Sequence, residues 1–213
     1  MKFLNHLRRH FLLKKAQKSA YFFQFYEDVD LNRKVKETTF VVFDCEATDL
    51  NPKKAKLLSV GAVKVKNLEL EISSSFYRLV KESEVKAAEI HGITKEDLEK
   101  YGRPPEEVIE DFLLYIKGSV LVGFYVKFDI SLIEKYSLNI FNYPITNYKI
   151  DVFNLYKGNY PGQKSLEDMA NEFGFSVKGR HIAIDDAYTT ALIFLKLIYS
   201  YREEKLKSIP LFL

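Results

Sequence analysis

The sequence predicts an α/β fold in which helices flank a mixed β-sheet. Three strand-like segments follow one another over residues 39–80 before any long helix, so we expect the sheet to begin antiparallel. From residue 104 onward helical and strand-like segments alternate, which is typical of a sheet covered by helices. A chain of 213 residues, 47% of them hydrophobic, is long enough to bury a core.

The N-terminal residues predict a basic amphipathic helix in front of this domain. Residues 1–36 carry nine Lys and Arg against three Asp and Glu, a net charge of +6 that leaves −3 for the rest of the chain. Such a helix either packs on the domain with its basic face in water or contacts nucleic acid, a partner protein or a membrane surface. Its apolar positions are Phe3, Leu4, Leu7, Phe11 and Leu12, opposite Arg8, Arg9, Lys14, Lys15 and Lys18.

The other elements follow in order along the chain. Pro104 and Pro105 open a helix whose apolar residues keep the helical period, and Ser165 with Asp168 has the pattern of a capping box. We expect strands at residues 39–46, 57–65, 68–80, 119–123 and about 145–150, and helices from residue 104, at about 128–136, from residue 165 and at about 184–202. The chain then divides into a helical extension with a linker (1–36), a main domain (37–205) and a C-terminal tail (206–213).

The composition indicates which cellular compartment to expect. No segment approaches the roughly 18 uninterrupted apolar residues that span a bilayer. The single cysteine cannot form an internal disulfide. We therefore expect a cytoplasmic protein without a membrane span.

Two carboxylates stand on one face of the first strand. Asp44 and Glu46 follow a β-branched and aromatic run that is typical of a buried strand. Side chains alternate along a strand, so these two point the same way and Cys45 points into the core on the other side. Like charges held together are unfavourable without a cation, and oxygen ligands favour hard ions such as Mg²⁺ or Mn²⁺. The pair therefore predicts a divalent-metal site.

Three further acidic residues stand where strands and helices end or begin. Asp129 follows the glycine-ended strand at residues 119–123, and Asp186 lies at the start of the final helix, five residues after His181. Taken alone, each has the position of a helix cap or of an acid that the helix dipole favours. Asp151 is assigned as a cap or a supporting residue and not as a metal ligand.

Together these residues match three motifs in the order of a known family. The chain resembles the DEDD exonucleases and, among them, the DnaQ-like 3′–5′ exonucleases of the DEDDh branch. That branch includes proofreading subunits of replicative DNA polymerases, oligoribonucleases and RNA-trimming enzymes. The resemblance covers about residues 39–197. Asp44 and Glu46 match the first motif, Asp129 the second, and His181 with Asp186 the third.

The resemblance implies a ribonuclease H-like fold and a site for two Mg²⁺ or Mn²⁺ ions. Asp44 would bridge the ions, and Glu46, Asp129 and Asp186 would complete the carboxylate set, with Glu46 also counted among the catalytic residues. His181 is the expected general base, since imidazole accepts a proton at neutral pH.

Residues beside the motifs are candidate substrate contacts. Family members often have Thr-Thr-Gly after the first Glu, where this chain has Ala-Thr-Asp, and His-Asn after the glycine of the second motif, where it has an aromatic pair. That pair either stacks on a base or belongs to the core. The expected contacts are Thr48, Asp49 and Leu50 at the terminal nucleotide, His91 shaping a loop near the substrate entrance, and Phe124 with Tyr125.

The sequence thus predicts a metal-dependent 3′–5′ exonuclease acting on single-stranded DNA ends. It would release nucleoside monophosphates and serve proofreading or repair, alone or beside a DNA polymerase subunit. One alternative is an RNA-trimming exoribonuclease of the same family. A second is a module that binds nucleic acid or a polymerase without cutting, and a third is a membrane-surface or scaffold protein that uses the basic helix. The complete set of four acids and His181 argues against a non-cutting module.

Overall fold

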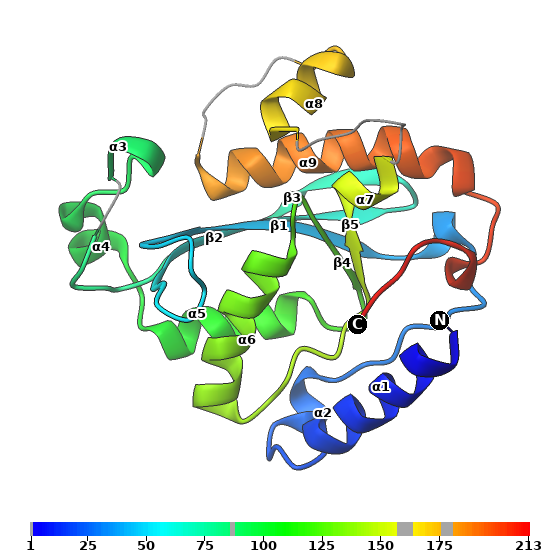
Figure 1. Ribbon diagram of the computed structural model, residues 1–213. Helices are drawn as coiled ribbons and strands as arrows, with labels where there is room; N and C mark the ends of the chain where they lie inside the picture. The colour runs from blue at the N-terminus through cyan, green and yellow to red at the C-terminus, as the bar shows by residue number, and fades with distance from the viewer. Residues whose placement is uncertain (1, 86–87, 157–163, 176–180) are drawn as a thin grey trace.

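The computed structural model describes residues 2–85, 88–156, 164–175 and 181–213. In these residues a five-stranded sheet has the order β3-β2-β1-β4-β5. The first three strands are antiparallel neighbours, whereas β4 runs parallel to β1 and β5 parallel to β4. This mixed sheet with helices on both faces (Figure 1) confirms the predicted fold class. The strands are β1 (Phe40–Ala47), β2 (Leu57–Lys66), β3 (Glu69–Leu79), β4 (Val120–Gly123) and β5 (Lys149–Asp151).

Alternation along β1 separates two hydrophobic cores. Phe40 faces one core, where its ring lies 5.0 Å from that of Phe194. Phe43 faces the other core, under a different set of helices. Asp44 and Glu46 occupy the same parity as Phe40, so they lie on its side of the sheet, as the strand period predicts. The helices on that side are α7 (Val152–Tyr156), α8 (Leu166–Glu172) and α9 (Ala183–Ile198), and those on the other are α5 (Pro105–Tyr115) and α6 (Lys127–Phe141).

The N-terminal segment packs against the main domain. Arg9 donates a hydrogen bond to the carbonyl oxygen of Thr146 at 2.6 Å. Phe25 is 3% exposed, and its ring lies 5.2 Å from that of Phe141. The segment therefore contributes apolar surface to the core as well as charge to the surface. Its elements are α1 (Lys2–Ala16), α2 (Phe22–Phe25) and the 3₁₀ turn η1 (Val35–Glu37).

The structure departs from the predicted boundaries around residue 145. The helix expected to end near residue 136 continues to Phe141, where Asn142 in the left-handed region ends it. The strand expected from residue 145 begins only at Lys149. Just before it, the side-chain amide of Asn147 donates hydrogen bonds to the carbonyl oxygens of Ile116 and Ser119, which holds this part of the chain as a loop.

Several short elements complete the described chain. None of the described helices is long and apolar enough to cross a membrane. The C-terminal segment begins beside residues 31–33, where the N–H of Leu206 donates to the carbonyl oxygen of Arg33 at 2.9 Å. It then reaches β5, where the N–H of Phe212 donates to the carbonyl oxygen of Lys149 at 3.0 Å. The short elements are α3 (Ala88–His91), α4 (Lys95–Tyr101), η2 (Tyr199–Tyr201) and η3 (Leu206–Ser208).

Candidate active site

Three carboxylates meet at the C-terminal end of β1. Asp44 and Glu46 come from the strand itself, and Asp186 comes from the first turn of α9. One carboxylate oxygen of each residue lies within 4.8 Å of the others. Because carboxylate oxygens are the ligands that Mg²⁺ and Mn²⁺ prefer, this trio can hold a divalent ion.

Gly61 allows α9 to approach this site. It lies on β2 as the cross-strand partner of Asp44. A Cβ atom at Gly61 would lie 2.2 Å from the backbone nitrogen of Ile184 and 2.3 Å from the carbonyl carbon of Ala183. Any side chain there would therefore displace the first turn of α9, which carries Asp186.

Asp129 reaches the same end of β1 from the other side of the sheet. It lies in the first turn of α6, is 5% exposed, and accepts a hydrogen bond at Oδ1 from the N–H of Cys45 at 3.1 Å. The pairing of β1 with β4 ends at Val42, so the N–H of Cys45 has no backbone partner on β4. The carboxylate of Asp129 accepts its hydrogen bond instead. The N-cap position of α6 is Val126, so Asp129 is not the N-cap.

Burial and mutual repulsion perturb the carboxyl groups of the site. Burial, followed by the charges of Asp129, Glu46 and Asp186, raises the pKa of Asp44 well above its ordinary value. Burial, then Asp186 and Asp129, raises the pKa of Glu46 to about 8. Burial likewise raises the pKa of Asp129 to about 7, although hydrogen bonds to its carboxylate oppose the shift. Acids in this state are stabilised by a cation among them, and the trio of Asp44, Glu46 and Asp186 is close enough together to share one. Asp129 is not part of that close group, and its place among the metal ligands stays a prediction.

Tyr125 and His181 share an unusual backbone conformation. Each directly precedes the N-cap residue of a helix that supplies an acid, α6 with Asp129 and α9 with Asp186. Their φ angles are +52° and +58°, in the left-handed region that costs a side-chain-bearing residue about 1–2 kcal/mol. Such strain is retained only where surrounding packing imposes it, and it clusters at functional sites.

His181 is exposed at the entry to α9. The adjacent segment Lys178-Gly179-Arg180 contains a glycine and by sequence would suit a mobile catalytic loop, but it lies outside the described residues. His181 directly precedes Ile182, the N-cap residue of the helix that carries Asp186. Its role as a base stays a prediction.

The residues that follow β1 differ in exposure. Thr48 is buried, and its N–H and hydroxyl both hydrogen-bond the backbone of Lys56, at 3.0 Å and 2.9 Å. Asp49 accepts a hydrogen bond from the N–H of Asn51, and Leu50 is 93% exposed. Thr48 therefore shapes the loop, while Leu50 is presented to the surroundings. Contact of the three with a substrate stays a prediction.

Phe124 and Tyr125 belong to an aromatic cluster that also contains Phe153. The ring centroids of Tyr125 and Phe153 are 4.9 Å apart, and those of Phe124 and Tyr125 are 4.6 Å apart. Tyr125 is 37% exposed, and its hydroxyl donates to the carbonyl oxygen of Lys164 at 3.2 Å. The cluster is thus partly core and partly surface, which allows one ring face to meet a base.

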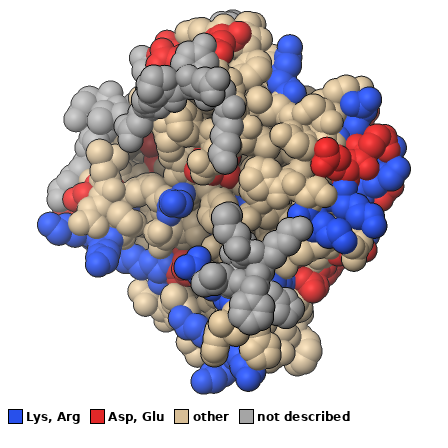
Figure 2. All heavy atoms as spheres, turned by 45° about the vertical axis from the view of Figure 1, so that its right-hand side comes forward, with Lys and Arg blue, Asp and Glu red and all other residues tan. Residues whose placement is uncertain are grey.

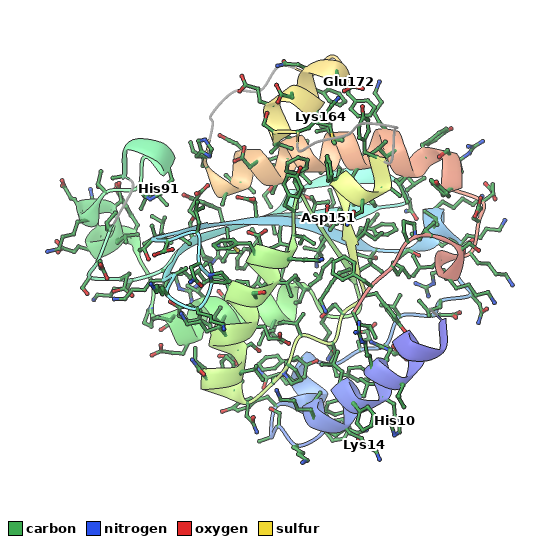
Figure 3. All side chains as sticks on the ribbon, in the orientation of Figure 1. His10, Lys14, His91, Asp151, Lys164 and Glu172 are labelled. Atoms are coloured by element: carbon green, nitrogen blue, oxygen red, sulfur yellow. The ribbon has the colours of Figure 1, made fainter. Side chains whose placement is uncertain are left out.

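His91 and Asp151 do not join the carboxylate trio. His91 is 4% exposed, and its Nδ1 accepts a hydrogen bond from the N–H of Ile93 at 3.1 Å, which fits a residue that shapes a loop. Asp151 accepts hydrogen bonds from the N–H groups of Val126 and Phe153. It thereby supports the turns into α6 and α7, as expected of a cap. Figure 3 shows His91 on α3 at one side of the sheet and Asp151 at the end of β5.

Comparison with known proteins identifies the family. The RNase T family model, described as an exonuclease, matches residues 41–194. This range includes all four acids and His181. The chain therefore belongs to this exonuclease family.

Two relatives come from bacterial replication. The chain is 34% identical over 166 residues to DNA polymerase III subunit epsilon of Aquifex aeolicus, covering 75% of this chain and 80% of that protein. It is 31% identical over 166 residues to the PolC-type DNA polymerase III of Thermotoga maritima, covering 76% of this chain and only 12% of the polymerase. The match to the PolC-type enzyme is thus to a small part of a much longer protein.

Solved structures share the fold at lower identity. Escherichia coli exonuclease I in complex with a dA16 oligonucleotide superposes with a TM-score of 0.67 at 17% identity, over 78% of this chain and 42% of that one. Pop2p of S. pombe, in a form with Mg²⁺ and Mn²⁺ bound, superposes with a TM-score of 0.66 at 16% identity, over 81% of this chain and 87% of that one. At these identities the likeness concerns the fold alone.

Sequence reasoning missed Gly61 and Phe153. Gly61 has a sequence signal, because a glycine inside a strand indicates a bulge or a close approach of another backbone. Phe153 has none, since its ring on α7 meets Tyr125 only through tertiary packing.

Proposed function

We propose that the protein is a metal-dependent 3′–5′ exonuclease that removes nucleotides from the 3′ end of single-stranded DNA. The observation that carries the proposal is the convergence of Asp44, Glu46 and Asp186 at one end of β1, within a chain of the exonuclease family. A cytoplasmic role in proofreading or repair, next to a polymerase, is supported by the relatives from DNA polymerase III.

The chain's own residues would divide the work. Asp44, Glu46, Asp129 and Asp186 would hold Mg²⁺ or Mn²⁺ and thereby place the scissile phosphate at the end of β1. The ions would supply neutralisation of phosphate charge and a water of lowered pKa. His181 would take the proton of the attacking water, which adds to the phosphorus while the 3′-oxygen of the next nucleotide leaves. Leu50 and Tyr125 would position the terminal nucleotide.

A cleavage assay tests the proposal directly. The purified protein is incubated with 5′-labelled single-stranded DNA and RNA in Mg²⁺, Mn²⁺ or chelator, beside Asp44→Asn as the matched control. A metal-dependent ladder that shortens from the 3′ end, and is absent in the control, is the expected result. A stronger ladder on RNA would identify an exoribonuclease of the same family. No ladder on either strand, from a folded protein that binds metal, would instead indicate a non-cutting binding module.

A further inference from the structure

An open cavity of about 520 Å³ lies on a different face of α6 from Asp129. Its walls come from segments far apart in the chain: α1, the start of α6, the start of β5, α7 and the C-terminal residues. Lys127, Ile130 and Ser131 line it from α6, and their spacing places them on one helix face. Asp129, by contrast, turns toward Cys45. The cavity is therefore separate from the carboxylate trio. It nevertheless begins at the N-terminal end of α6, the end that carries Asp129.

Three cations line this cavity: Arg8 from α1, Lys127 from α6 and Lys149 from β5. Among the residues that the structure describes, none of the three forms an ion pair. Lys149 is 4% exposed, and its ammonium group donates only a 3.3 Å hydrogen bond, to the carbonyl oxygen of Ile145. The carboxylate of Glu134 acts on Lys149 without forming an ion pair with it. Burial of the ammonium group is therefore only partly compensated, and an anion in the cavity would stabilise it.

The titration of Lys149 agrees with this reading. Burial lowers the pKa of Lys149 to about 8, the nearby charge of Arg9 acts in the same direction, and Glu134 opposes them. A phosphoryl group beside the ammonium would raise this pKa and further favour the charged form.

The other lining residues suit a nucleotide unit. Asn154 and Ser131 add polar groups, whereas Ile130 and Phe212 add apolar surface for a sugar or base. The volume lies within the roughly 300–1,000 Å³ typical of ligand sites, enough for one nucleotide with its phosphate. Figure 2 shows basic side chains along the lower and left parts of the view, and others mixed with acidic ones on the right.

We propose that this cavity binds a backbone phosphate of the nucleic-acid strand whose 3′ end occupies the carboxylate site. The proposal rests on the proposed function for the identity of the strand. Arg8, Lys127 and Lys149 hold the phosphate, so α1 forms part of the path of the substrate. Lys127 precedes Asp129 by two residues, which places the cavity close to the scissile end.

The test measures binding of a 5′-labelled ten-nucleotide DNA strand by fluorescence anisotropy, in chelator so that nothing is cut. Arg8→Ala and Lys127→Ala each remove one cation from the cavity. Lys14→Ala is the matched control, because Lys14 is exposed on the outer side of α1 (Figure 3) and does not line the cavity. Each cavity variant should weaken binding about tenfold and reduce the salt dependence by about 0.7 per lost contact, with Lys14→Ala within about twofold of wild type.

Equal binding by the cavity variants and the control would overturn the proposal. Inorganic phosphate and a nucleoside monophosphate serve as competitors, and the proposal is also wrong if either occupies the cavity as tightly as the ten-nucleotide strand, since the site would then serve small phosphates. Because no cleavage is measured, failure of this proposal stays distinct from absence of exonuclease activity.

Discussion

Gly61 on β2 lies directly across from Asp44 on β1, and the backbone of α9 rests on it. The missing side chain at one position thus allows Asp186 to come within ligand distance of Asp44 and Glu46. The site depends on close packing between a strand and a helix as much as on its acids.

Gly61→Ala should therefore damage the site without touching a carboxylate. The added methyl group overlaps the backbone of Ile184, and overpacking of this kind costs about 1–3 kcal/mol or more. We expect a lower melting temperature and a loss of most of the stabilisation by Mg²⁺ or Mn²⁺. Gly174→Ala is the control, since Gly174 has a φ of +76° but open space around it, so that it loses stability through strain alone. Equal metal stabilisation in the two variants would contradict the role of Gly61.

Metal binding should stabilise the protein more strongly as pH rises. The pKa of Glu46 is raised to about 8 and that of Asp129 to about 7, so between about pH 4 and pH 8 the folded metal-free protein holds more protons than the unfolded chain. Its free energy of unfolding therefore falls as pH rises through this window. Ions displace those protons, so the metal-induced rise in melting temperature should grow from about pH 5 to pH 8. A rise independent of pH would argue against these acids as ligands.

His181→Ala should separate catalysis from metal binding. If His181 is the general base, the variant keeps its metal-dependent stabilisation but loses about 10²-fold or more in turnover. Asp44→Asn is the comparison that should lose both. Melting curves with and without metal, beside initial cleavage rates, make the distinction, and wild-type turnover in His181→Ala would refute the role.

The N-terminal segment should prove part of the folded core. Phe25 is 3% exposed and packs against Phe141 and Tyr143, so Phe25→Ala should lower the free energy of unfolding by about 3–5 kcal/mol. Phe23 is 87% exposed, and Phe23→Ala should change the free energy of unfolding by no more than about 0.5 kcal/mol. Urea unfolding measures both. Deletion of residues 1–36 would consequently remove core contacts together with the basic face, which is why single charge substitutions are the better test of α1.

Much of the fold was predictable because its signals are local. The period of two along residues 39–46 placed Asp44 and Glu46 on one face, and the helical period of the last helix placed Asp186 near its start. The short helices α3, α4 and α7 were not predicted. With four and five residues, α3 and α7 carry too few periods to be recognised, whereas α4 has a capping box, Thr94 with Asp97, of the kind that located α8.

The sequence by itself determined that the sheet is mixed and that β1, β2 and β3 follow one another as its antiparallel part. It also determined which acidic residues make up the motifs. Tertiary structure alone decided that α9 rests on Gly61, that Asp129 accepts the N–H of Cys45, and that α1 encloses a basic cavity with α6 and β5. The physical reason is range: periodicity and capping act over a few residues, whereas these contacts join residues distant in the chain and depend on how two packed cores bring them together.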